Sequence, residues 1–270
     1  MQDLCQDLLD EYRALAALCA TLSPAEWREA SAFYGWAAWD EIAHLCYFDE
    51  TGLQSATDPA GFARDAALLS QRIGRGEEIS AIARERYGAL DGPALLARWR
   101  HLHEGLVAAL SKLDPKARLP WYGPPMSARS FATARLMETW AHGQDVWDTV
   151  RRERPASARL KHIAHLGVTT FRWTFMNRKL EVPAELPYVE LAAPDGSVWT
   201  WNEPSSESSG KCFVRGSALD FCLLVTQRRH VDDTALQYRG DGTQQWLLLA
   251  QCFAGPPADG PGPGVRRVVV

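Results

Sequence analysis

The sequence shows no long apolar run and no basic, then apolar, opening segment. It has no run of about 18 uninterrupted apolar residues, the length that a membrane-spanning helix needs. Its first residues, from Met1 to Asp7, are acidic, whereas a signal peptide opens with basic residues and continues with an apolar stretch. We therefore expect a cytoplasmic protein that makes no contact with a membrane.

Positive charge and paired cysteines are also scarce. The 29 lysines and arginines are outnumbered by 33 aspartates and glutamates, which leaves a net charge of -4 and no basic stripe, so we expect no nucleic-acid partner. The six cysteines are scattered without a Cys-x-x-Cys pair, which predicts buried thiols. Glycine-rich phosphate-binding motifs and the Gly-x-Ser-x-Gly turn of serine hydrolases are absent as well.

What is present predicts a helical N-terminal part. The chain has 270 residues, of which 46% are hydrophobic, and this length favours two folding units over a single large core. In the first part, apolar residues recur at three- and four-residue intervals between helix-breaking residues. We predict an antiparallel four-helix bundle over residues 1–151, with long helices near 3–22, 35–54, 92–114 and 127–150 and a shorter one near 59–74.

The pattern changes after the charged stretch 151–155. Segments with helical spacing now flank short alternating segments that are typical of strands. The helical segments are 157–179, 218–229 and 242–253, and the strand-like ones are 187–191, 198–201 and 211–214. We predict a smaller α+β domain over residues 156–254, followed by a Pro/Gly-rich tail over 255–270.

Two spaced motifs could carry chemistry. The second long helix contains Asp40-x-x-x-His44, and the fourth contains Glu138-x-x-x-His142-x-x-Asp145. Four residues turn a helix by about 400°, so the two side chains of each pair lie only about 40° apart on one face. If the two helices meet, His44, Glu138 and His142 supply two imidazoles and a carboxylate, which suits zinc or another divalent metal with a coordination position left open.

Spacing alone leaves other interpretations open. A Glu/His pair at this interval also stabilises an exposed helix, and Asp40 can pair with an arginine instead of supporting His44. Tryptophans share both stretches, which favours buried faces, where ionisable groups persist only when paired or coordinated. We expect Glu41, Asp49 and Glu50 to face solvent; together with Asp40 they would otherwise form an all-carboxylate site that prefers magnesium or calcium.

The two motifs also resemble a known family. Gly35-Trp36-x-x-x-Asp40-x-x-x-His44-Leu45, followed by Glu138-x-x-x-His142-x-x-Asp145, is similar to the metal-binding domain of mycothiol-dependent maleylpyruvate isomerases, a branch of the DinB-like bundles. The resemblance covers roughly residues 1–150 and implies that His44, Glu138 and His142 bind the metal. Asp40 and Asp145 are then candidates for supporting these ligands. The C-terminal part looks like that of metal-binding proteins linked to wyosine base formation.

The resemblance implies a chemistry as well. It predicts a divalent metal, foremost Zn²⁺ with Ni²⁺ or Fe²⁺ as alternatives, together with a low-molecular-weight thiol. The function expected is that of a thiol-using isomerase or transferase acting on a small electrophilic acid. A binding protein with a structural or vestigial metal is the alternative, supported by the aromatic residues of the C-terminal part. The oligomeric state stays open, with a homodimer as one option.

Overall fold

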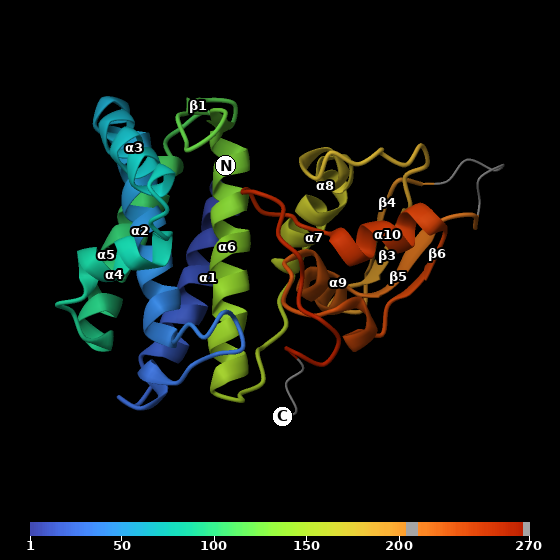
Figure 1. Cartoon of the computed structure of the whole chain (residues 1–270), viewed down its shortest axis with the longest axis horizontal. Helices are drawn as coiled ribbons and strands as arrows, with labels where there is room; N and C mark the ends of the chain where they lie inside the picture. Colours follow the sequence, from blue (N-terminus) through green and yellow to red (C-terminus); the bar gives the residue numbers. More distant parts are fainter. Residues whose placement is uncertain (204–209, 267–270) are drawn as a thin grey trace. The chain divides into compact units, whose positions relative to one another are not determined.

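The computed structural model describes residues 1–203 and 210–266, which form two compact units, Met1–Arg152 and Glu153–Val270 (Figure 1). The first unit is helical, and the second combines helices with a small sheet. This confirms the predicted division into a helix-rich part and a sheet-containing C-terminal part. In the described part of the chain, no helix is both long and apolar enough to cross a membrane.

Four long helices make the core of the first unit. They are α1 (Gln2–Cys19), α2 (Ala38–Thr57), α5 (Gly92–Leu110) and α6 (Ala128–Thr149). Helix α2 packs against α5 and α6, and α1 packs against the same two helices (Figure 1). Apolar residues at helical spacing supply the contacts, such as the fully buried Leu8, Leu15 and Ile42. Each of these helices therefore buries one face against two neighbours.

Local capping residues set the starts of these helices. The Asp91 carboxylate accepts a hydrogen bond from the Ala94 backbone N–H at the start of α5, where Pro93 follows at a position that needs no N–H. The Ser127 hydroxyl accepts from the Ser130 N–H, so Ser127 is the N-cap of α6.

The second long helix begins later than its sequence pattern predicts. Residues 30–37 form a reverse turn closed by a bridge between Ala30 and Ala37 and by a hydrogen bond from the Ser31 N–H to the Trp36 carbonyl. The turn places Gly35 at φ 72°, a conformation that glycine adopts without strain. As a result α2 starts at Ala38, and it continues beyond the predicted end to Thr57.

Shorter elements complete the first unit. Helix α3 (Pro59–Gly74) lies where a short helix was predicted, and both it and α4 (Ile79–Tyr87) pack on α2. Helix α4 was not predicted, because only Ile82, Ala83 and Tyr87 of its nine residues are buried. The strands β1 (Arg118–Leu119) and β2 (Met126–Ser127) pair in antiparallel fashion, and the 3-10 turn η1 (Glu26–Arg28) precedes α2.

The second unit is built around a four-stranded sheet of order β4-β3-β5-β6. Its strands are β3 (Tyr188–Ala192), β4 (Val198–Trp201), β5 (Phe213–Ser217) and β6 (Gln237–Arg239). Strand β3 is parallel to β5, while the β3–β4 and β5–β6 pairs are antiparallel. Strand β6 was not predicted, since three polar residues at a sheet edge show no clear alternation.

Helices cover this sheet. They are α7 (Leu160–Thr169), α8 (Phe171–Asn177), α9 (Ala218–Val225) and α10 (Asp241–Leu249), with the 3-10 turn η2 (Val231–Asp233) between α9 and β6. The helix predicted over 157–179 is divided at Thr170 into α7 and α8. Helices α7 and α9 approach closely, because a Cβ atom added to Gly167 would lie 2.9 Å from the Val225 side chain.

The Pro/Gly-rich C-terminal segment is tied to the second unit as far as it is described. Its residues 255–266 contain no helix or strand. The Arg178 guanidinium forms an ion pair with Asp259 at 2.9 Å, and the Arg266 guanidinium donates to the Gln227 carbonyl at 2.7 Å. Residues 267–270 of the predicted tail lie outside the described part of the chain.

Candidate metal centre

The predicted ligands come from two helices that pack side by side. Helix α2 carries His44, and α6 carries Glu138 and His142 one turn apart. His142 Nε2 lies 3.3 Å from Glu138 Oε2, and His44 Nε2 lies 4.0 Å from the same oxygen. One ligand atom from each residue lies within 4.8 Å of the others. The structure thus brings together the three residues that the sequence singled out, and their binding of a metal stays a prediction.

The three candidate ligands differ in their exposure to solvent. The His142 side chain is 6% exposed, the His44 side chain 15% and the Glu138 side chain 25%. The two imidazoles are therefore largely shielded from water, while the carboxylate reaches the surface. A small molecule could approach the three ligand atoms from the side of Glu138.

Aromatic rings enclose the two imidazoles. The Trp36 ring stacks on the His142 ring with centroids 5.9 Å apart and also lies 5.4 Å from the His44 ring. Phe33 meets His142 edge-on at 5.6 Å, and Phe48 lies 4.8 Å from His44. Phe33 and Trp36 belong to the turn that precedes α2, so this turn forms a wall of the site.

Glu41 is the main residue that sequence reasoning placed wrongly. We expected it to face solvent, but it is fully buried, and its Oε2 lies 2.6 Å from His142 Nδ1. Its i+4 neighbour Leu45 is also fully buried, so Glu41 lies on the inward face of α2. The four-residue interval between Glu41 and Leu45 could have indicated this position in the sequence. We expected Glu41 in solvent because it is charged.

Asp49 was also expected in solvent and is fully buried. Its Oδ1 accepts hydrogen bonds from Tyr12 Oη at 2.6 Å and Arg135 Nε at 2.8 Å, and its Oδ2 accepts from Trp99 Nε1 at 2.7 Å. Burial alone would lower the pKa of Arg135, but the neighbouring Asp49 carboxylate, with smaller contributions from Tyr12 and Glu138, raises it. Arg135 therefore stays charged inside the protein.

Glu50 is the third residue that does not lie freely in solvent. Its side chain is 20% exposed, and its carboxylate forms ion pairs with Arg98 at 2.6 Å and Arg86 at 3.0 Å. Because Glu50, Glu41, Asp49 and Asp40 each have a different partner, they do not converge. In the described residues, the groups able to hold an ion are His44, Glu138 and His142, and Glu41, His142 and Asp145. The all-carboxylate alternative therefore has no geometric basis.

The two supporting candidates have different surroundings. Asp40 Oδ1 accepts from Arg84 Nε at 2.7 Å, and Oδ2 accepts from the Ala37 backbone N–H at 3.0 Å. Asp40 thus caps α2 and pairs with an arginine, the alternative that the sequence left open. Asp145 is buried and lies with Glu41 and His142 in the second group of ligand atoms.

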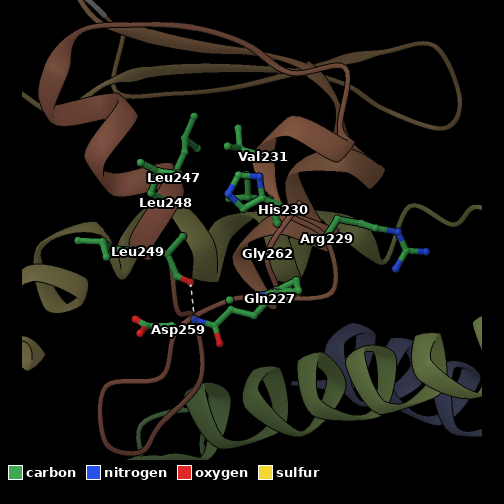
Figure 2. Close-up of a pocket in the computed structure, with 13 residues that line it drawn as sticks. Gln227, Arg229, His230, Val231, Leu247, Leu248, Leu249, Asp259 and Gly262 are labelled. Carbon is green, nitrogen blue, oxygen red and sulfur yellow. Dashed lines mark hydrogen bonds between the residues drawn. The ribbon is translucent and has the colours of Figure 1, made fainter. Parts of the chain in front are cut away.

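The second unit has a separate cavity of about 320 Å³, shown in Figure 2. Leu224, Leu247 and Val231 line it together with the polar side chains of Gln227 and His230. The Gln227 amide donates to the Ala250 carbonyl at 3.0 Å, the dashed line in Figure 2, and to the Ala258 carbonyl at 2.7 Å. Both donor hydrogens of the Gln227 amide are therefore engaged by backbone carbonyls of the cavity wall.

Comparisons with known proteins show the family of the chain. The model of the mycothiol maleylpyruvate isomerase N-terminal domain matches residues 8–147. Uncharacterised proteins from two strains of Mycobacterium tuberculosis are each 43% identical over 258 residues, which cover 94% of this chain and 96% of the relative.

Solved structures share the fold. A crystal structure of the mycothiol-dependent maleylpyruvate isomerase matches with a TM-score of 0.53 and 17% identity, covering 88% of this chain and 92% of that one. A histidine-to-alanine mutant of that isomerase matches over the same shares with a TM-score of 0.54 and 16% identity. At such identities the likeness concerns the course of the backbone.

Proposed function

Since the chain belongs to the family of the mycothiol maleylpyruvate isomerase N-terminal domain, which is DinB-like, we propose that it is a divalent-metal-binding enzyme that uses a low-molecular-weight thiol. The observation that carries the proposal is the convergence of His44, Glu138 and His142 within 4.8 Å. The four long helices are, in this proposal, a four-helix bundle that holds the metal between α2 and α6.

The donor set fits a divalent ion. Two imidazole nitrogens and one carboxylate oxygen suit Zn²⁺ best, with Ni²⁺ and Fe²⁺ as alternatives. Two ligand atoms on a tetrahedral zinc ion with bonds of about 2.0–2.1 Å lie about 3.3 Å apart. His142 Nε2 and Glu138 Oε2 already have this separation at 3.3 Å, and His44 Nε2 needs to approach only slightly from 4.0 Å.

The surrounding residues prepare the site for a thiol. Bound here, the ion would supply Lewis acidity that lowers the pKa of a thiol, so that the thiolate exists near neutral pH. Trp36, Phe33 and Phe48 shield the imidazoles from water, and Glu138 is the most exposed of the three proposed ligands, so a small molecule would approach from its side. Three protein ligands and an open position are typical of catalytic zinc.

The reaction class follows from the family. The structural relative is named as a mycothiol-dependent maleylpyruvate isomerase, so we propose for this chain an isomerisation or a thiol transfer on a small electrophilic acid. A thiolate is the nucleophile that such an acid accepts. The chain's own residues would hold the ion, fix the imidazoles and keep bulk water away from them.

Two variants test where the ion binds. His44 belongs only to the first group of ligand atoms and Asp145 only to the second. We expect zinc titration of the metal-free protein to give one ion per chain, His44→Ala to lower the affinity by at least about 100-fold, and Asp145→Asn to retain most of it. If Asp145→Asn abolishes binding and His44→Ala does not, the ion belongs to the other group.

Turnover is tested separately with maleylpyruvate and mycothiol, and with glutathione or cysteine in place of mycothiol. We expect turnover that depends on the thiol, ends on chelation and returns with Zn²⁺. Zinc binding without turnover of any such pair would favour a non-enzymatic binding protein.

A further inference from the structure

We propose that Glu41 is a positioning residue for His142, because its carboxylate fixes which imidazole nitrogen faces the metal centre. This inference rests on the proposed metal site and goes beyond its three ligands. Glu41 lies on α2 and His142 on α6, so their contact also joins the two helices that carry the ligands.

The hydrogen bond determines the state of the ring. An ionised carboxylate only accepts hydrogen bonds, so the 2.6 Å contact with Glu41 Oε2 requires the proton on His142 Nδ1. The lone pair of a neutral ring then lies on Nε2, which is 3.3 Å from Glu138 Oε2. Glu41 thus turns the donor nitrogen of His142 toward Glu138 and His44.

Packing fixes the plane of the same ring. Trp36 lies nearly parallel to it at 15°, and Phe33 meets it at 89°. These contacts limit tilting, but apolar rings do not distinguish one nitrogen from the other. The choice between Nδ1 and Nε2 therefore depends on the hydrogen bond that His142 donates to Glu41.

The position of Glu41 is costly without such a role. Burying a carboxylate removes its hydration, and an apolar side chain would fill the same fully buried place without that loss. Carboxylates that accept from the far nitrogen of a metal-binding histidine orient the ring and increase its basicity. The 2.6 Å contact gives Glu41 this arrangement.

Three variants separate positioning from structure. Glu41→Gln keeps an acceptor oxygen and removes the charge, Glu41→Leu removes both, and Asp40→Asn is the matched control. Asp40 precedes Glu41 on the same helix, carries the same charge and contacts Arg84 and Ala37 instead of His142. We expect zinc affinity to fall about 10- to 100-fold in Glu41→Leu, less in Glu41→Gln, and to stay unchanged in Asp40→Asn.

A second measurement needs no metal. Nitrogen-15 NMR of histidine-labelled, metal-free protein at pH 8 reports which ring nitrogen of His142 carries the proton, with His142→Gln used for assignment. We expect a protonated Nδ1 in the wild type and in Glu41→Gln, and a loss of this preference in Glu41→Leu. A loss of stability that left the surroundings of His142 unchanged would not alter its tautomer.

The outcomes separate this inference from the proposed function. An unchanged tautomer in Glu41→Leu, or zinc affinity equal to that of the wild type, overturns the positioning role while the metal site stands. If the wild type binds no zinc, the proposed function fails, and the tautomer still decides the role of Glu41. If Glu41→Leu loses zinc binding completely while His44→Ala keeps it, Glu41 is itself a ligand and the inference is overturned.

Discussion

At the scale of single residues, the first unit buries several ionisable side chains. The loss of hydration is compensated differently at each of them. Asp49 is satisfied by three donors, and Glu41 lies against a histidine. Among residues 1–203 and 210–266, neither ring nitrogen of His103 on α5 has a hydrogen-bond partner. It stacks on Tyr12 with centroids 4.5 Å apart and stays neutral, because burial lowers its pKa to about 4.

The neutral His103 makes folding stability depend on pH. The unfolded chain binds a proton at His103 below pH of about 6.5, whereas the folded chain does so only near pH 4. The contribution of the neutral His103 to the free energy of unfolding is therefore fully present above pH of about 6.5 and is lost as the pH falls toward 4. Between pH 7 and 5 the loss amounts to about 2 kcal/mol.

Replacing this histidine should remove that dependence. We expect His103→Phe to keep the stacked ring and to reduce the difference in unfolding free energy between pH 7 and pH 5 by about 2 kcal/mol. Urea unfolding of both proteins in the presence of a chelator at the two pH values measures it. An equal difference in both proteins would show that His103 does not titrate as described.

At the scale of elements, the interface between α2 and α6 contains a series of polar pairs. From one end to the other, Glu41 meets His142, His44 meets Glu138, and Asp49 meets Arg135. One turn further along α2, the Phe131 ring packs closely against Gly52. A Cβ atom at Gly52 would lie 2.9 Å from this ring. Along this series the residue numbers rise on α2 and fall on α6, so the two helices pack in an antiparallel register.

The buried pair Asp49 and Arg135 should stabilise this register. Removing either partner leaves a buried charge unpaired, at a cost of about 3–5 kcal/mol. We expect the double variant Asp49→Leu/Arg135→Met to cost less than the sum of the single variants by at least about 1 kcal/mol. Urea unfolding of the four proteins gives this coupling energy.

The exposed pair Arg84 and Asp40 serves as the comparison. Its guanidinium is 51% exposed, so its coupling should stay below about 1 kcal/mol. If the coupling energy of Asp49 and Arg135 is no larger than that of Arg84 and Asp40, the buried pair does not have the stabilising role proposed for it.

At the scale of the whole molecule, the chain divides between Arg152 and Glu153. Arg152 still belongs to the first unit, because its guanidinium binds Glu26 at 2.8 Å and Thr21 at 2.7 Å. Residues 152–156 have no helix or strand. We propose that residues 1–152 are an independent folding domain, one residue longer than the domain that the sequence pattern predicted.

Limited proteolysis with a glutamate-specific protease should therefore cut first after Glu153. The fragment that ends there contains all three proposed ligands, so we expect it to stay folded and to bind zinc as the full chain does. Mass spectrometry identifies the cut, and circular dichroism with zinc titration follows the isolated fragment. Early cuts within the long helices, or an unfolded fragment, would contradict independent folding.

Sequence alone predicted the four long helices and singled out the three candidate ligand residues, because both depend on local order. Apolar spacing placed α1, α2, α5 and α6, and the four-residue interval joined Glu138 to His142 on one face. The sequence did not determine which residues of different helices contact each other. Glu41 and Asp49 have charges typical of surface residues, and only the packing of α2 on α6 showed them buried against His142 and Arg135. A local pattern gives the face of a helix, whereas the neighbour of that face depends on which helices meet and in which register.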